Sequence, residues 1–164
     1  MSTIEATLVV VIRDGKVLLV EKSQFSSIGP GTWNAPGGKR KPSETFRACA
    51  CREVREEVGL DVNESDLRKV AVMKVFRGSV NFMTIHAYRV SDFSGEPQIS
   101  NACTEVAWFA HGALPFENML PGDQLWFPLL LGRAMFEGVL LLDASGLRCS
   151  GCTLVLVGRE GFPE

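Results

Sequence analysis

Three glutamates, Glu53, Glu56 and Glu57, stand three and four residues apart in a stretch with a helical pattern. At about 100° per residue they fall within an arc of roughly 100°, so they project to one side of the helix. Like charges at these spacings repel each other by roughly 0.2–0.5 kcal/mol per pair. A divalent ion such as Mg²⁺ removes that repulsion, because it takes hard oxygen ligands and also binds phosphate oxygens. The cluster therefore predicts metal-assisted chemistry on a phosphate.

An ordinary salt-bridged surface is the alternative interpretation of this helix, since Arg52 lies four residues before Glu56 and can pair with it in solvent. The segment before the helix favours the metal site. Gly37 and Gly38 allow the backbone to approach a ligand or a metal, because glycine has no Cβ. Glu44 lies at the start of the predicted helix, where its charge suits the positive end of the helix dipole.

The segment from Gly38 to Leu60 resembles the Nudix box, the signature of a family of phosphoanhydride hydrolases. The matching positions are Gly38, Glu44, Arg52, Glu53, Val54, Glu56, Glu57, Gly59 and Leu60. The resemblance implies that the Gly37 carbonyl and the carboxylates of Glu53, Glu56 and Glu57 hold Mg²⁺, with Mn²⁺ as the alternative ion. It also implies that Arg52 and Glu44 orient those acids and that one glutamate activates the attacking water.

The rest of the chain fits chemistry of this kind. Phosphoryl transfer needs charge neutralisation and alignment more than a covalent nucleophile from the protein, so no Ser-His or Cys-His pair is required. The two histidines are His86 and His111. His86 lies in a strand of alternating apolar residues, which favours a packed or hydrogen-bonded side chain over a catalyst.

Composition restricts the partners. The chain has 164 residues, of which 46% are hydrophobic and 22% charged, and its net charge is −2. These values are typical of one globular domain, and we expect a single domain over residues 1–164. The charge gives no reason to expect a nucleic acid polymer or an anionic membrane as the partner, whereas a small phosphorylated nucleotide remains open. With no apolar run of roughly 18 residues and no export signal, we expect a cytoplasmic protein, monomeric or homodimeric.

The five cysteines are an odd number and do not predict a disulfide framework. Cys149-Ser150-Gly151-Cys152 has the spacing of half a zinc or redox site. No second cysteine or histidine pair completes such a site, and Ser-Gly suits a hairpin turn between two short strands. We therefore interpret this segment as a turn.

The order of elements predicts an α+β fold, a Nudix-type α/β/α sandwich with a mixed sheet between helices. Asp14-Gly15 predicts a hairpin turn, Ser43 is the expected N-cap of the first helix, and Gly59 its C-terminal cap. The expected strands are Thr7 to Arg13, Lys16 to Lys22, Lys69 to Phe76, Val80 to Val90, Val106 to Phe109, Val139 to Asp143 and Cys152 to Val157; the expected helices are Glu44 to Val58 and Leu125 to Phe136.

Beyond the box, residues Thr7 to Lys22, Thr32 to Gly38 and Pro115 to Gly138 resemble the branch of the family that hydrolyses oxidised purine nucleoside triphosphates such as 8-oxo-dGTP. The resemblance implies that Asn34 hydrogen-bonds the base, Trp126 stacks on it and Asp123 contacts the purine edge. The remaining implied pocket residues are Thr7, Lys22, Gly38, Phe76 and Met83. Each also has a structural interpretation: Trp126 as core, Phe76 and Met83 as strand residues, Asn34 as a turn former.

Several positions depart from that branch. Gly122-Asp123 replaces two adjacent aspartates, so one base-reading carboxylate is missing. Leu120 replaces a tryptophan, and Lys74 an aromatic residue. Cys103 replaces an acid that assists metal binding, although Glu105 would face the same way in an extended segment.

The resemblance implies a purine nucleoside triphosphate pyrophosphohydrolase, which releases a monophosphate and pyrophosphate, and the departures predict a relaxed or altered base preference. The alternatives are a Nudix hydrolase of a nucleotide sugar or dinucleotide, and a non-catalytic Nudix-fold binding module. The second is disfavoured because all four box glutamates are present.

Overall fold

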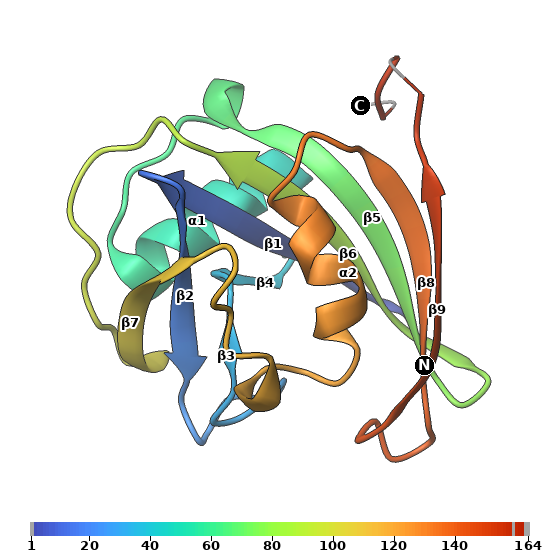
Figure 1. Cartoon of the computed structure of the whole chain (residues 1–164). Helices are drawn as coiled ribbons and strands as arrows, with labels where there is room; N and C mark the ends of the chain where they lie inside the picture. The colour runs from blue at the N-terminus through green and yellow to red at the C-terminus, as the bar shows by residue number, and fades with distance from the viewer. Residues whose placement is uncertain (1, 159, 163–164) are drawn as a thin grey trace.

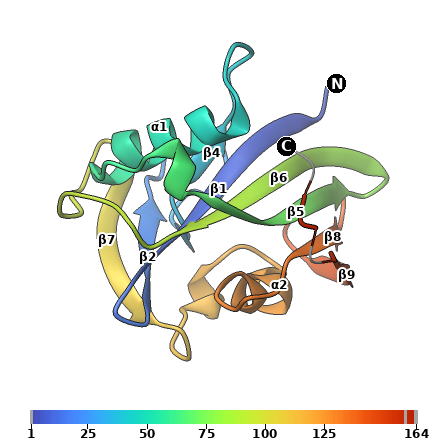
Figure 2. The same cartoon turned by 90° about the horizontal axis from the view of Figure 1, so that it is seen from above.

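The computed structural model describes residues 2–158 and 160–162 of the chain. Within them, a nine-stranded mixed sheet has the order β3-β2-β1-β6-β5-β8-β9, with β4 added to β1 and β7 to β2. Figures 1 and 2 show α1 and α2 on opposite faces of this sheet. The predicted α+β sandwich with a mixed sheet between helices is confirmed. The strands are β1 (Ile4–Arg13), β2 (Lys16–Lys22), β3 (Trp33–Asn34), β4 (Gly37–Lys39), β5 (Arg68–Arg77), β6 (Val80–Val90), β7 (Cys103–Ala110), β8 (Phe136–Leu142) and β9 (Cys149–Leu156).

Strand β1 lies inside the sheet, antiparallel to β2 and β4 and parallel to β6. Its side chains alternate between two apolar cores. Leu8 and Val10 pack on the side of α2, whereas Val9 and Val11 pack on the side of α1. The β1–β2 turn has positive φ at both Asp14 (51°) and Gly15 (70°), as a two-residue hairpin turn requires. The predicted hairpin is confirmed.

Helix α1 (Phe46–Val58) carries the glutamate cluster. Its N-cap is Thr45, whose hydroxyl accepts a hydrogen bond from the Ala48 N–H; the prediction of Ser43 was wrong by two residues. Glu44 consequently lies before the helix and not in its first turn. Gly59 ends the helix with φ 71°, as predicted.

Helix α2 (Asp123–Leu130) is shorter than the predicted helix Leu125 to Phe136. It starts after Gly122, whose φ is 88°, and ends before Gly132. Phe136 already belongs to β8, which pairs in parallel with β5 and buries that ring completely in the core. Packing of Phe136 against the sheet therefore outweighs the helical pattern of the sequence before it.

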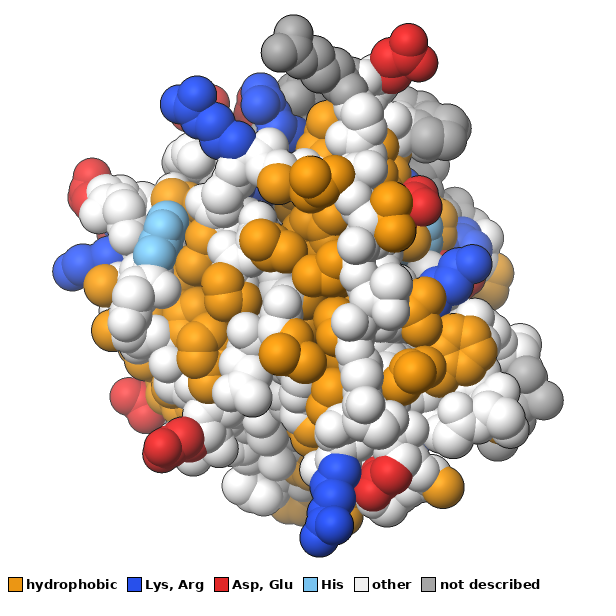
Figure 3. Space-filling model, turned by 45° about the vertical axis from the view of Figure 1, so that its right-hand side comes forward, with side chains coloured by type: hydrophobic (Ala, Val, Ile, Leu, Met, Phe, Trp, Pro, Cys, Tyr) orange, Lys and Arg blue, Asp and Glu red, His pale blue; other side chains and the backbone are white. Residues whose placement is uncertain are grey.

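The last two strands form an antiparallel pair, as predicted, but the turn is elsewhere. Cys149 and Cys152 lie inside β9, and the chain turns at residues 143–148, where the Asp143 carboxylate accepts hydrogen bonds from Ser145 and Leu147. The prediction of a turn at Ser150-Gly151 was wrong. This edge of the sheet comes forward in Figure 3, where hydrophobic side chains gather over β8 and β9.

Two smaller elements complete the described chain, the 3₁₀ turns η1 (Glu64–Asp66) and η2 (Phe116–Asn118). No helix in residues 2–158 and 160–162 has the length and apolar character needed to cross a bilayer. All five cysteines are free thiols.

Candidate active site

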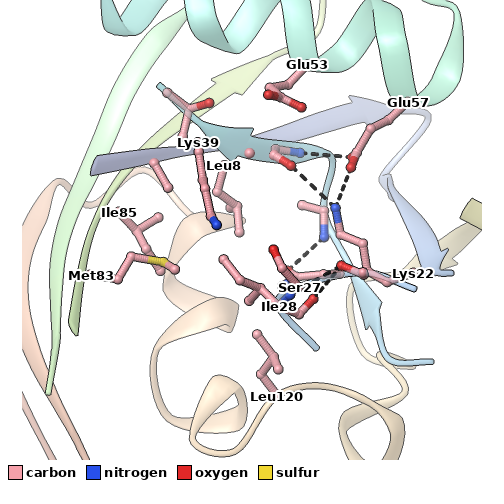
Figure 4. Close-up of a pocket in the computed structure, with 17 residues that line it drawn as sticks. Leu8, Lys22, Ser27, Ile28, Lys39, Glu53, Glu57, Met83, Ile85 and Leu120 are labelled. Carbon is pink, nitrogen blue, oxygen red and sulfur yellow. Dashed lines mark hydrogen bonds and ion pairs between the residues drawn. The ribbon is translucent and has the colours of Figure 1, made fainter. Parts of the chain in front are cut away.

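A cavity of about 310 Å³ opens beneath α1, where β1, β2 and β4 meet the loop after β2. Figure 4 shows Glu53 and Glu57 entering it from the helix, with Met83, Ile85 and Leu120 on the side away from α1. The cavity therefore has an acidic end under the helix and an apolar end towards α2. Its lining residues are Ala6, Thr7, Leu8, Lys22, Ser26, Ser27, Ile28, Asn34, Ala35, Gly37, Gly38, Lys39, Glu53, Glu57, Met83, Ile85 and Leu120.

Glu57 is buried at the acidic end and is held from two sides. Lys22 Nζ donates to Glu57 Oε1 at 2.5 Å, and the Gly37 N–H donates to Glu57 Oε2 at 3.1 Å. The same Lys22 ammonium lies 3.4 Å from the Gly37 carbonyl oxygen. Burial raises the pKa of Glu57, and the charge of Lys22 and these hydrogen bonds oppose the rise.

The two glycines of β4 are in close contact with different groups, Gly37 with the backbone of β1 and Gly38 with a side chain of α1. A Cβ on Gly37 would lie 2.1 Å from the Thr7 carbonyl oxygen, and a Cβ on Gly38 would lie 2.4–2.5 Å from the Glu53 carboxylate. Real Cβ atoms do not approach other atoms so closely. Gly38 therefore leaves the space in which the Glu53 carboxylate lies.

Arg52 connects three glutamates. It pairs with Glu44 through Nε and Nη2, with Glu53 Oε1 at 2.6 Å and with Glu56 Oε2 at 3.0 Å. Its hydrogen bonds hold the pKa of Glu44 down at about 2, and the pKa of Arg52 is raised in turn, chiefly by Glu44. Arg52 and Glu44 thus have the geometry of the predicted brace.

The box glutamates do not all converge. Glu53 and Glu57 line the cavity, but the Glu56 side chain is 56% exposed and lies outside it. In the described parts of the chain, no group of three or more Asp, Glu, His or Cys side chains is arranged to hold a metal ion.

The donor atoms at the acidic end nevertheless fit a hard cation. The Gly37 carbonyl and the Glu57 carboxylate both contact the Lys22 ammonium, so a positive charge already lies between two of the oxygens predicted to bind a metal. Glu53 adds a third oxygen group facing the same cavity. Carboxylate and carbonyl oxygens are the donors that Mg²⁺ prefers.

A second, narrower cavity of about 70 Å³ lies next to the apolar end. Met83, Leu120, Ile28 and Ile85 line both cavities. The second one is further lined by Gly29, Val75, Arg77, Phe82, Pro121, Asp123, Trp126, Leu140, Leu142 and Gly146. The predicted base-binding residues Asp123, Trp126 and Met83 are thus brought together.

Asp123 is 3% exposed and accepts two hydrogen bonds, from the Leu120 N–H and the Trp126 Nε1–H, each at 3.2 Å. Burial raises the pKa of its carboxyl group to about 7, although both hydrogen bonds act to lower it. Near neutral pH, Asp123 can therefore act as a donor or as an acceptor.

The other predicted pocket residues differ in their placement. Asn34 lines the first cavity, and its Oδ1 accepts from the Ala35 N–H at 2.9 Å. Thr7 also lines that cavity but is buried, with Oγ1 3.3 Å from Cys49 Sγ. Phe76 lines neither cavity; its neighbours Val75 and Arg77 line the second.

Two charged residues of the cavities were not found from the sequence. Lys39 follows directly on Gly38, and its ammonium group points into the first cavity (Figure 4). Its position one residue after the glycine pair could have indicated it. Arg77 lines the second cavity from the end of β5, and no motif marks it.

The departures noted in the sequence have structural counterparts. At Gly122, where the sequence departs from a pair of aspartates, a Cβ would lie 2.7 Å from Leu140 Cδ1 and 3.1 Å from Cys149 Sγ, so a side chain there requires these neighbours to shift. Cys103 is buried, with Sγ 3.4 Å from the Glu57 carbonyl oxygen. Glu105 is exposed and lines neither cavity.

The comparison with known families agrees with this geometry. The NUDIX domain model matches residues 3–130, which include both cavities except for the contributions of β8 and the turn after it. The chain belongs to the Nudix family. This Nudix chain is 39% identical over 133 residues to the oxidized purine nucleoside triphosphate hydrolase of Danio rerio, an alignment that covers 80% of this chain and 82% of that protein.

Solved structures share the fold at low sequence identity. The MutT protein from Bacillus halodurans superposes with a TM-score of 0.77 at 19% identity, over 92% of this chain and 97% of that one. A bifunctional NMN adenylyltransferase/ADP ribose pyrophosphatase from Francisella tularensis, complexed with AMP and a Mn ion, has a TM-score of 0.63 at 19% identity, over 79% of this chain and 41% of that one.

Proposed function

We propose that this Nudix chain is a divalent-cation-dependent pyrophosphohydrolase that cleaves a purine nucleoside triphosphate, oxidised or not, to the monophosphate and pyrophosphate. The observation that carries the proposal is one continuous site with two chemically different ends. Glu53, Glu57, Lys22 and Lys39 surround the first end, and Trp126 lines the second beside an apolar wall. The relative from Danio rerio supports the substrate class by its name.

We propose Mg²⁺ as the cation, with Mn²⁺ as the alternative. The Gly37 carbonyl and the carboxylates of Glu53 and Glu57 would hold it, and Glu56 would join them only by turning inward from its exposed position. The ion would neutralise phosphate charge and lower the pKa of water. Membership of the Nudix family supports a divalent ion, and one structural relative, from Francisella tularensis, was solved in complex with a Mn ion.

The chain's own groups then have separate tasks. Lys22 and Lys39 place two positive charges beside the phosphates, which lowers the cost of building up negative charge there. Arg52 donates a hydrogen bond to Glu53 Oε1 and so orients that carboxylate, and one glutamate of the site would accept the proton of the attacking water. Water adds to phosphorus as the bond to the leaving phosphate oxygen breaks.

The base would lie at the apolar end. Met83 and Leu120 line both cavities, so a planar ring between them would reach from the first into the second. Asn34 would hydrogen-bond the base from the first cavity, and Asp123 and Trp126 would meet its far edge. With Gly122 in place of a second carboxylate, we expect the base preference to be altered.

We also propose that residues 1–164 form one domain, because β8 and β9 extend the same sheet beyond the matched region. We propose the cytoplasm as its compartment, since five free cysteines suit a reducing environment. The net charge of −2 supports a small nucleotide over a nucleic acid polymer as the partner. A monomer or a homodimer is compatible with this proposal.

A substrate panel tests the function. Canonical and oxidised nucleoside triphosphates, nucleotide sugars and dinucleoside polyphosphates are incubated with Mg²⁺, and the products are identified by chromatography. We expect pyrophosphate and a monophosphate from purine nucleoside triphosphates. Strong preference for a nucleotide sugar or a dinucleotide over every triphosphate would contradict the proposal, as would turnover that does not depend on a divalent ion.

A further inference from the structure

Arg77 is a charged side chain at the base end that the proposed reaction does not yet use. Its Nε atom is buried and has no hydrogen-bond partner among the described residues. In the part of the chain that the structure describes, one atom in each of Arg40, Asn81 and His86 is likewise buried without a partner, but none of these residues lines either cavity of the site. The Nε atom is covered by the protein, but the two terminal nitrogens of the same guanidinium group are not among these buried atoms, so they are the donors that a ligand in the second cavity could reach.

The surroundings of Arg77 hold its guanidinium group in place. Its Cζ lies 3.7 Å from the centroid of the Phe82 ring, so the charged plane rests on an aromatic face. The turn after β8 passes over it at Gly146, where a Cβ would lie 2.7 Å from Arg77 Nε. Phe82 covers one face of the guanidinium group. Its N–H groups lie in the plane of that group, so stacking on Phe82 does not use them as hydrogen-bond donors.

Asp123 is the other ionisable side chain that lines the second cavity. The two residues do not neutralise each other, since both Asp123 oxygens accept hydrogen bonds from Leu120 and Trp126 and Arg77 Nε has no partner. The second cavity, of about 70 Å³, is less than a quarter of the first, of about 310 Å³. We therefore assign the edge of the base to the second cavity and the rest of the nucleotide to the first.

We infer that Arg77 is a base-specificity residue of this chain, whose guanidinium group donates hydrogen bonds to the 6-oxo edge of a purine. The inference rests on the proposed function and names its substrate class more closely: purine nucleotides with a carbonyl at C6, such as guanine and hypoxanthine, over those with an amino group at C6.

Hydrogen-bond chemistry gives the reason. Guanine and hypoxanthine present two neighbouring acceptors, O6 and N7, which match the paired N–H groups of an arginine. Adenine presents an amino donor at C6, and two donors cannot hydrogen-bond each other. An 8-oxo purine has a proton on N7, but 8-oxoguanine keeps O6 and adds O8 as acceptors. Arg77 therefore selects for the 6-oxo group and does not require oxidation at C8.

The loss of the neighbouring carboxylate fits the same inference. Leu140 and Cys149 fill the space beside Gly122, so the second acceptor of an aspartate pair is absent. Arg77, at the end of β5, supplies donors to the same cavity. The site thus combines one buried carboxyl group with one cation, and its selectivity should differ from that of a site with two carboxyl groups.

The test compares kcat/KM for dITP and dATP, which differ at C6, in the wild type, Arg77→Met and Arg77→Lys. We expect the wild type to prefer dITP by about 5- to 150-fold, the range for a bidentate arginine contact. Arg77→Met should abolish that preference mainly by slowing dITP. Arg77→Lys should retain only a part of that preference, because an ammonium group keeps the positive charge but cannot make the paired contact. The matched control is Arg68→Met at the exposed start of β5, which should keep the wild-type ratio.

A second substrate pair isolates the ring nitrogen. Replacing dGTP by 7-deaza-dGTP removes the N7 acceptor. This replacement should lower kcat/KM of the wild type and leave kcat/KM of Arg77→Met unchanged. An unchanged dITP/dATP ratio in both Arg77 variants, or a wild type that prefers dATP, would overturn the inference. If Arg77→Met does not fold, as judged by thermal unfolding, Arg77→Lys and the 7-deaza pair still decide.

Binding of the monophosphates separates this inference from the proposed function. The Kd values of dIMP and dAMP are measured by calorimetry without any turnover. Selective binding of dIMP that is lost in Arg77→Met, in a protein that hydrolyses no triphosphate, would retain the role of Arg77 and refute the pyrophosphohydrolase. Turnover of triphosphates with no base selectivity would retain the pyrophosphohydrolase and refute the role of Arg77.

Discussion

The two ends of the site are built in different ways. At the acidic end the carboxylates meet cations: Glu57 pairs with Lys22, and Glu44, Glu53 and Glu56 pair with Arg52. At the base end the wall is apolar, and its two ionisable residues, Asp123 and Arg77, do not pair with each other.

The difference shows where each end gets its properties. The acidic end comes largely from one stretch of chain, Gly37 to Glu57, with Lys22 added from β2, and its charges are balanced in the fold. The base end collects side chains from β5, β6, α2, β8 and the turn after β8. Changes at the acidic end should therefore affect catalysis more than folding, whereas changes at the base end should affect selectivity and packing together.

The largest effect is expected from the cavity carboxylates. Glu57→Gln and Glu53→Gln each remove a charge that would hold the cation, so kcat should fall by about 10³-fold or more. Glu57→Gln should also lower the melting temperature, because it leaves the buried Lys22 ammonium without its charged partner. Glu56→Gln, at an exposed position, should cost far less. Steady-state kinetics with saturating Mg²⁺ measure this, and Glu64→Gln on the exposed η1 turn is the control. Equal losses in Glu56→Gln and Glu57→Gln would remove the distinction made by the structure.

A smaller loss is expected at Gly38. In Gly38→Ala the new Cβ would meet the Glu53 carboxylate at 2.4–2.5 Å, so that side chain must move. We expect kcat to fall by roughly 10- to 100-fold, because misplacing a catalytic group by about 1 Å has that order of effect. Gly112→Ala is the matched control, since a Cβ there meets nothing within 4 Å. Full activity in Gly38→Ala would show that the position of Glu53 is not critical.

The same contrast explains what the sequence could predict. The helix α1, its C-terminal Gly59 and the glycine pair are local features with defined spacing, and their positions follow from the chain itself. The exposed position of Glu56 does not follow from the spacing. Side chains spread over a helical arc of roughly 100° share one side of the helix but need not all reach the same cavity. The cation Lys22, predicted as a pocket residue, gains its partner Glu57 only through folding.

The base end could be predicted only in part. Asp123 and Trp126 follow from the resemblance, but a register shift between Lys69 and Ala71, which puts both Val70 and Ala71 into the core on the α2 side, decides which β5 side chains face α2. A shift of one residue in a strand exchanges the two faces. Phe76 is consequently outside the cavities and Arg77 inside. The same dependence on long-range pairing explains the wrong end of the second helix, since Phe136 is fixed by β5 and not by its own neighbours.

The pH dependence of folding should report Asp123. Its pKa is raised from 3.8 to about 7 in the folded state, so the folded protein binds the proton more tightly than the unfolded chain does. The free energy of unfolding should therefore decrease as the pH rises from about 4 to 7, by up to about 4 kcal/mol from this group, and then level off.

Asp123→Asn cannot ionise, so denaturant unfolding of this variant should lack that decrease. Its amide oxygen can still accept one of the two hydrogen bonds. A difference in unfolding free energy between wild type and variant that stays constant from pH 4 to 8 would contradict the assignment of the raised pKa to Asp123.

The smallest effect is expected from restoring the missing carboxylate. Gly122→Asp requires φ 88° and places a Cβ 2.7 Å from Leu140 Cδ1, so it should destabilise the fold by about 1–3 kcal/mol. It should not create the base preference of a site with two aspartates. Gly158→Ala, where a Cβ meets nothing within 4 Å, is the control for thermal unfolding. A stable Gly122→Asp protein would mean that Leu140 and Cys149 move aside readily.

The most direct test of the acidic end is a titration of Mn²⁺ into the protein with a non-hydrolysable nucleoside triphosphate analogue, followed by electron paramagnetic resonance. The spectrum separates free from bound ion. We expect the wild type to bind Mn²⁺ at the analogue, and the double variant Glu53→Gln/Glu57→Gln to bind the ion at least about 10-fold more weakly. Equal affinity in the two proteins would show that these carboxylates do not hold the cation, and the proposed site would be wrong.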